Sequence, residues 1–118
     1  MTIPSRVMGS GNSPLSTENI CGKATTALTA TGTSATDALQ LTTSYSVVAT
    51  TAASTGVKLL ATENGATMVV ANDGASTLTV YPPTGSTIDG AASVTIATTK
   101  RRAFWGTSAT TWVSLLGA

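Results

Sequence analysis

Residues 67–81 read TMVVANDGASTLTVY and carry the clearest structural signal in the chain. Two short runs rich in β-branched residues, 67–71 and 77–81, flank the Asn-Asp-Gly turn at 72–74. Asn, Asp and Gly favour turns that reverse the chain, whereas Val and Thr fit pleated surfaces better than helical turns. The stretch therefore predicts two consecutive antiparallel strands.

Similar runs continue on both sides of this segment. Asn64-Gly65 separates a run at 57–61 from the run at 67–71, and both residues tolerate the positive φ of a type I′ hairpin turn. We therefore expect three consecutive antiparallel strands. The other expected strands lie at 37–41, 45–51, 93–96, 103–105 and 111–115.

Short strands separated by turn residues define the expected fold class. Pro82 and Pro83 must end the strand before them, because proline donates no ladder hydrogen bond, and Asp89-Gly90 supplies a further turn. We predict an all-β fold, an antiparallel β-sandwich or small barrel that is jelly-roll-like. No long internal repeat and no solenoid period is visible in the sequence.

The first residues differ from the rest of the chain. Residues 1–24 contain Pro4, Pro14 and three glycines and show no sustained strand or helix period. We interpret them as an extended N-terminal arm attached to a β-domain at 25–118. A disordered terminus is the alternative interpretation.

The composition restricts the possible functions. The 118 residues include 25 Thr, 13 Ser and 18 Ala but no His, and the net charge is only +1. Without His the commonest general base and metal ligand are missing, and the five acidic residues are scattered. We therefore expect no enzyme, no cofactor, no metal and no small-molecule substrate. The weak net charge predicts no nucleic-acid partner.

The single cysteine, Cys21, bears on the compartment. It has no partner for an internal disulfide and no His to make it a nucleophile, so a small hydrophobic role and assembly in a reducing cytoplasm are expected. The sequence shows neither a signal peptide nor an apolar stretch of membrane-spanning length, so we expect no membrane association.

Candidate contact residues are few because the chain has few large side chains. If Phe104 is in the core, Trp105 points outward, towards a partner or towards the arm of its own chain. Three consecutive basic residues before it fit an acidic patch on a partner or a solvated turn. The candidate interface residues are Trp105, Tyr81, Pro82, Pro83, Lys100, Arg101, Arg102, Met8 and Pro14.

A family resemblance appears in the second half of the chain. Residues 69–92 read VVANDGASTLTVYPPTGSTIDGAA, with AFWG at 103–106 and TTW at 110–112. This pattern resembles small structural proteins of tailed bacteriophages, namely head decoration (cement) proteins and fibre modules. The basic residues 100–102 depart from the plainer Gly/Ser turn expected there, which leaves room for a partner contact specific to this chain.

The resemblance implies a function without a catalytic site. It implies a virion component on the capsid surface, which binds the major capsid protein as a homotrimer and stabilises contacts between capsomers. A core built from Ala, Thr, Val and a few Leu buries little apolar area per residue, which also favours stability gained by oligomerisation. The alternative is a fibre or tail module for receptor or glycan adhesion, with Tyr81, Pro82 and Trp105 in contact with sugar.

Overall fold

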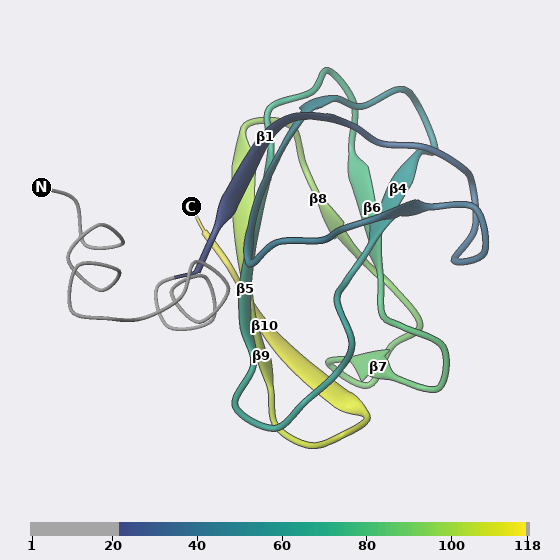
Figure 1. Ribbon diagram of the computed structural model, residues 1–118. Coiled ribbons are helices and arrows are strands. Elements are labelled where there is room, and N and C mark those ends of the chain that lie inside the picture. Colours follow the sequence, from purple (N-terminus) through teal and green to yellow (C-terminus); the bar gives the residue numbers. More distant parts are fainter. Residues whose placement is uncertain (1–21, 118) are drawn as a thin grey trace, which may run out of the picture.

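The computed structural model describes residues 22–117, which form ten β-strands and no helix (Figure 1). The prediction of an all-β protein is confirmed. Residues 1–21 of the predicted arm lie outside the described residues. The strands are β1 (Ala24–Thr29), β2 (Leu39–Gln40), β3 (Tyr45–Thr50), β4 (Gly56–Lys58), β5 (Thr67–Asn72), β6 (Leu78–Tyr81), β7 (Thr87–Ile88), β8 (Val94–Ile96), β9 (Lys100–Gly106) and β10 (Thr111–Leu116).

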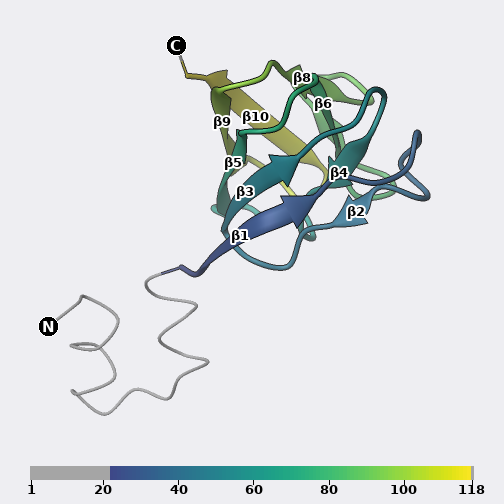
Figure 2. The same cartoon turned by 90° about the horizontal axis from the view of Figure 1, so that it is seen from above.

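The strands form two layers, a six-stranded sheet, most of which lies on the left of Figure 1 with its edge strand β7 at the lower right, and a four-stranded sheet on the right. Their orders are β1-β3-β5-β9-β10-β7 and β2-β4-β6-β8. Figure 2 shows β1, β3, β5 and β9 side by side in this order. From β1 to β6 the chain alternates between the sheets, and neighbours within each sheet run parallel. The chain thus winds as a β-solenoid.

This winding corrects the predicted antiparallel order of the three strands around 57–81. β4 and β5 lie in different sheets, and β4 instead pairs in parallel with β6. Gly65 does adopt a positive φ of 87°, but its N–H donates to the carbonyl of Gly106, 2.8 Å away, and the turn makes no hairpin. The residues at the turn predict the turn correctly, but they do not predict which sheet the next strand joins.

The predicted antiparallel β-sandwich or small, jelly-roll-like barrel is wrong as well, because the first six strands coil between two sheets in which their neighbours run parallel. Strands β1, β3 and β5 begin at Ala24, Tyr45 and Thr67, so each coil returns to the same sheet at a nearly constant spacing. Positions aligned by the register differ in character, because Tyr45 lies opposite Ala24 and Val69, and Val48 lies opposite Leu28 and Asn72, and therefore no repeat is visible in the sequence.

Antiparallel pairing is found in the C-terminal half. β9 lies antiparallel between β5 and β10, and β8 pairs antiparallel with β6. β6 ends at Tyr81, as the following prolines predict. Asp89 and Gly90 take positive φ values of 52° and 79° within a turn closed by hydrogen bonds between Ile88 and Ala91, which confirms the predicted turn.

The core lies between the two layers. Trp112 and Phe104 are its largest fully buried side chains, and alternate residues of the strands supply the rest. Met68 and Val70 of β5, for example, point inward and are buried, whereas Val69 between them faces outward. Aliphatic side chains fill the remaining space, namely Leu41, Val48, Val57, Leu59, Leu78, Val80, Ile88 and Ile96.

A buried amide joins the layers at one end. Asn72, fully buried at the end of β5, accepts hydrogen bonds at Oδ1 from the Thr51 hydroxyl (2.8 Å) and the Gly74 N–H (3.0 Å). Its Nδ2 donates to the carbonyls of Ser76 and Ile96, both at 2.8 Å. All four hydrogen-bonding positions of the amide are therefore occupied, and they connect β5 with the ends of three other segments.

Candidate protein-docking face

Large apolar side chains are exposed on the outer surface of the six-stranded sheet. Because Phe104 and Trp112 are buried, strand alternation directs Trp105, Val113 and Leu115 outward. Trp105 is 40% exposed and Leu115 64% exposed. Tyr45, at the start of β3, is exposed on the same surface, since the next residue along is buried.

Strand register arranges these side chains in two rows. Tyr45 lies opposite Val69, Val69 opposite Ala103, and Ala103 opposite Leu115, which makes a first row across four strands. Trp105 and Val113 pair in a second row, two residues away along β9 and β10. Together we call them the outer apolar face: Tyr45, Val69, Ala103, Trp105, Val113 and Leu115.

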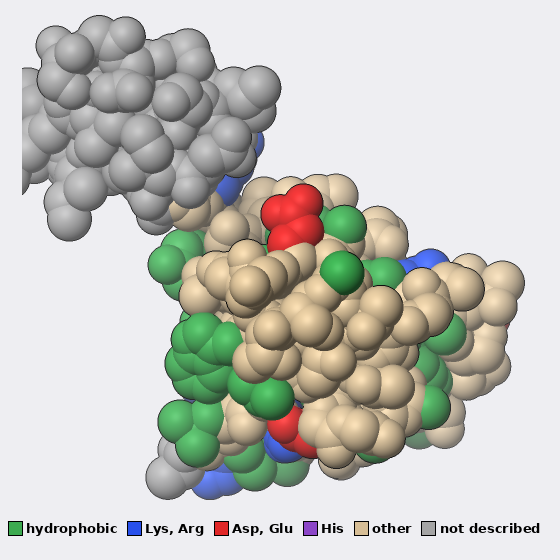
Figure 3. All heavy atoms as spheres, turned by 90° about the horizontal axis from the view of Figure 1, so that it is seen from below, with side chains coloured by type: hydrophobic (Ala, Val, Ile, Leu, Met, Phe, Trp, Pro, Cys, Tyr) green, Lys and Arg blue, Asp and Glu red, His purple; other side chains and the backbone are tan. Residues whose placement is uncertain are grey.

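The space-filling view is consistent with this arrangement. Figure 3 shows hydrophobic side chains gathered along the left flank, the side on which the six-stranded sheet lies. A shallow hollow of about 160 Å³ lies on this sheet, lined mainly by Val69, Ala103 and Leu115 with Arg101 nearby. A contiguous apolar patch of this kind is typical of a protein-binding surface.

Five members of the face were not among the predicted contacts, namely Tyr45, Val69, Ala103, Val113 and Leu115. Val113 and Leu115 could have been found from the alternation in TWVSLL at 111–116, because a buried Trp112 places them on the opposite side. Tyr45 gives no such signal, since only the parallel pairing of β3 with β5 brings it to the row.

The three basic residues lie on β9 itself and not in a turn before it. Arg102 points to the inner side, where its Nε donates to the Ser114 hydroxyl at 2.8 Å and its guanidinium lies 3.5 Å from the Asp89 carboxylate. Arg101 lies on the outer side, 3.3 Å from the Asp73 carboxylate in an exposed ion pair. Lys100 is the half-buried first residue of the strand.

Asp89 is held as a carboxylate by these neighbours. Partial burial would raise its pKa, but hydrogen bonds from the Ser114 hydroxyl and backbone N–H, together with the Arg102 charge, place the pKa below its usual value. The pKa of exposed Asp37 is also lowered, mainly by hydrogen bonds from the backbone N–H and hydroxyl of Ser34. Through these hydrogen bonds, both carboxylates stabilise the loops in which they lie.

Among the described residues, the predicted contacts Tyr81, Pro82 and Pro83 are not brought to the outer apolar face. Tyr81 ends β6 in the other sheet, where its hydroxyl donates to the Thr33 carbonyl at 3.2 Å. Pro82 is buried and Pro83 half-buried beside it. Met8 and Pro14 lie outside the described residues.

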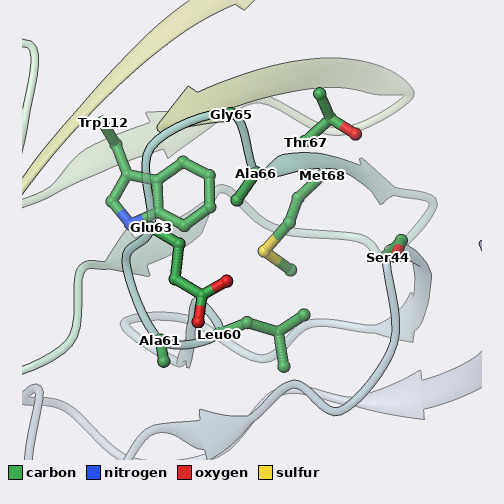
Figure 4. A pocket seen from close by; sticks show the side chains of 9 residues that line it. All are labelled: Ser44, Leu60, Ala61, Glu63, Gly65, Ala66, Thr67, Met68 and Trp112. Carbon is green, nitrogen blue, oxygen red and sulfur yellow. The ribbon is translucent and has the colours of Figure 1, made fainter. Parts of the chain in front are cut away.

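A separate pocket of about 420 Å³ opens at the start of β5 (Figure 4). Leu60, Met68 and the Trp112 ring give it apolar walls, and Glu63 and Ser44 contribute polar groups. The buried Trp112 Nε1 has no hydrogen-bond partner among residues 22–117. One carboxylate without a second acid or base gives this pocket no general acid–base pair.

Comparisons with known proteins add no relative: no family model, no curated protein and no solved structure matches this chain. Within the described range no group of His, Cys, Asp and Glu side chains is placed to hold a metal ion, and no helix long and apolar enough to cross a membrane is found. The fold and the face define a small all-β protein with an apolar candidate docking surface.

Proposed function

We propose that this chain is a non-enzymatic structural protein of a phage virion, a capsid decoration (cement) protein that binds the outside of the head as a homotrimer. Its partners are the major capsid protein and copies of itself. It is assembled in the host cytoplasm and resides on the capsid surface. In this role it stabilises contacts between capsomers.

The outer apolar face is the observation that carries this proposal. Within residues 22–117 nothing covers its exposed Trp, Tyr, Val and Leu side chains, although large apolar residues are scarce in the chain. Covering apolar surface stabilises a complex by about 25 cal/mol per Å². A partner that covers this face therefore gains more binding free energy than one that covers the Thr- and Ser-rich remainder of the surface.

Self-association fits the same composition. A core made mainly of Val, Leu, Ile and Ala side chains, with one Phe and one Trp, buries little apolar area per residue. Small domains of this kind commonly obtain further stability by oligomerisation. The threefold symmetry comes from the resemblance to phage decoration proteins, and the arm at 1–24 is the part that reaches across to neighbouring capsid subunits.

Adhesion to a receptor glycan, as part of a fibre or tail, is the second candidate. The exposed rings of Trp105 and Tyr45 on one face favour it, because aromatic rings stack on apolar faces of sugars. Tyr81 and Pro82, also expected to take part, belong to the other sheet and do not extend that surface.

The copy number of the chain in purified phage particles separates the two candidates. Quantitative mass spectrometry with the major capsid protein as internal reference should find an amount comparable with that protein. An amount far smaller, comparable with a tail fibre, would favour adhesion and contradict decoration. Absence from the particle would reject both.

A further inference from the structure

The pocket at the start of β5 is shaped by backbone hydrogen bonds around the turn that carries Glu63. The Ala66 N–H closes this turn by donating to the Glu63 carbonyl at 3.2 Å. Gly106 of β9 donates its N–H to the Ala66 carbonyl and accepts the Gly65 N–H at its own carbonyl, both at 2.8 Å. A Cβ on Gly106 would overlap the Glu63 carbonyl oxygen, so the turn packs directly against this glycine. The pocket is therefore formed by the fold itself and does not require a ligand.

A single charged group lies among apolar side chains in this pocket. Leu60, Met68 and the Trp112 ring form its apolar walls, and the Glu63 carboxylate is the one formal charge among the lining residues. Figure 4 shows the Glu63 side chain extending between Trp112 and Leu60. Among residues 22–117 no Lys or Arg forms an ion pair with this carboxylate, whereas two aspartates elsewhere each pair with an arginine. The charge is thus available to a ligand.

Charge and shape together restrict the class of ligand. The carboxylate repels anions, and in the described part of the chain it belongs to no cluster of side chains that could hold a metal ion. An uncharged apolar ligand would cover Glu63 without giving the carboxylate a partner, which costs free energy. An organic cation meets both conditions, because its charge pairs with Glu63 while its carbon chain packs against Leu60 and Met68. The volume of about 420 Å³ is typical of a small-molecule site.

We propose that this pocket binds an alkylammonium group, that is, a primary ammonium at the end of an aliphatic chain. The ammonium donates hydrogen bonds to the Glu63 carboxylate, and the chain lies against Leu60 and Met68. A lysine side chain of a bound protein and a free amine share this chemistry. The inference goes beyond the proposed function, since the pocket is lined by no residue of the outer apolar face.

An NMR titration of the purified protein with n-butylammonium chloride tests the proposal. The Trp112 indole N–H, which has no hydrogen-bond partner within 22–117, belongs to a pocket-lining residue and reports on what enters. The indole of Trp105, exposed on the outer apolar face, is the internal control, and Trp105→Phe assigns the two resonances. Sodium butyrate and 1-butanol present a similar carbon chain with a negative charge and with no charge. All samples are kept at equal ionic strength.

n-Butylammonium should shift the Trp112 resonance saturably and leave that of Trp105 unchanged, with an affinity at least about fivefold higher than that of butyrate or 1-butanol. Glu63→Gln, at an exposed position, should weaken binding at least about fivefold because the ion pair is lost. Asp73→Asn removes an exposed carboxylate just beyond the other end of β5 and should change the affinity less than about twofold. Equal affinities for the three compounds, or unchanged binding in Glu63→Gln, would overturn the inference.

A second titration distinguishes the two sources of the ammonium group. Nα-acetyl-lysine-N-methylamide carries the same group on a peptide unit, and binding at least as tight as that of n-butylammonium assigns the pocket to a lysine of a partner protein. Markedly weaker binding assigns it to a free amine. Either result supports an alkylammonium ligand, whereas no saturable shift with either compound overturns it. Because no virion is used, this failure is distinguishable from absence of the chain in phage particles.

Discussion

At the scale of single residues, two polar side chains, those of Asn72 and Asp89, contribute much of the specificity of a fold that is built mainly from small side chains. Asn72 is buried with all four hydrogen bonds made, where the chain passes from one sheet to the other. Its position in an Asn-Asp-Gly turn was evident from the sequence. Its role between layers was not, because it depends on Thr51 and Ile96, both distant in sequence.

Replacing Asn72 with Ala should lower the free energy of unfolding by at least about 2 kcal/mol, because buried groups of Thr51, Gly74 and Ile96 and the half-buried Ser76 carbonyl lose their partner. Urea denaturation measures the change. Asp73→Ala, at the exposed neighbouring position, is the control and should change stability by under about 1 kcal/mol. Equal effects of the two substitutions would contradict the structural role of the amide.

Asp89 should contribute to the acid sensitivity of the fold. Its pKa is below the unfolded value of about 3.9, so its contribution to stability is present above that pH and is lost as the pH falls through the folded pKa. Asp89→Asn should flatten the pH dependence of the free energy of unfolding below about pH 4, and Ser114→Ala should do so in part. Part of the slope remains, because the pKa of Asp37 is lowered too. An unchanged slope in Asp89→Asn would contradict this assignment.

At the scale of strands, local sequence located most elements but not their partners. The runs expected at 67–71 and 77–81 are β5 and β6, and the prolines after Tyr81 end β6 as predicted. After β5 the chain could turn back, so that β6 pairs with β5, or cross to the other sheet. Which of the two occurs depends on how the inward faces of the strands pack against each other. Hairpins and solenoid coils present the same alternation of apolar residues, and so the parallel pairing could not be read from periodicity.

Two neighbouring residues of β9 test which face of the strand belongs to the core and which face binds a partner. Phe104→Ala should cost about 3–5 kcal/mol of stability because it empties part of the core. Trp105→Ser, one residue along, should change stability by about 0.5 kcal/mol or less but weaken self-association or capsid binding. Denaturation and sedimentation velocity measure the two properties. Equal loss of stability in both variants would show that Trp105 belongs to the core.

At the scale of the whole molecule, the two layers protect one core and leave one outer surface apolar. The candidate site could be predicted from the sequence only in part: Trp105 follows from strand alternation beside Phe104, whereas Tyr45, Val69 and Leu115 become neighbours only through the mixed sheet. An exposed apolar surface of this kind suits a subunit that gains stability when a neighbour covers it.

A reconstruction of the phage particle that carries this chain tests the central proposal most directly. The decoration role predicts density of the size of three of these all-β domains on the outer capsid surface at threefold or quasi-threefold positions, with the face around Trp105 and Val113 against a neighbouring subunit. Density confined to the tail or its fibres, or a capsid surface without these domains, would contradict the account.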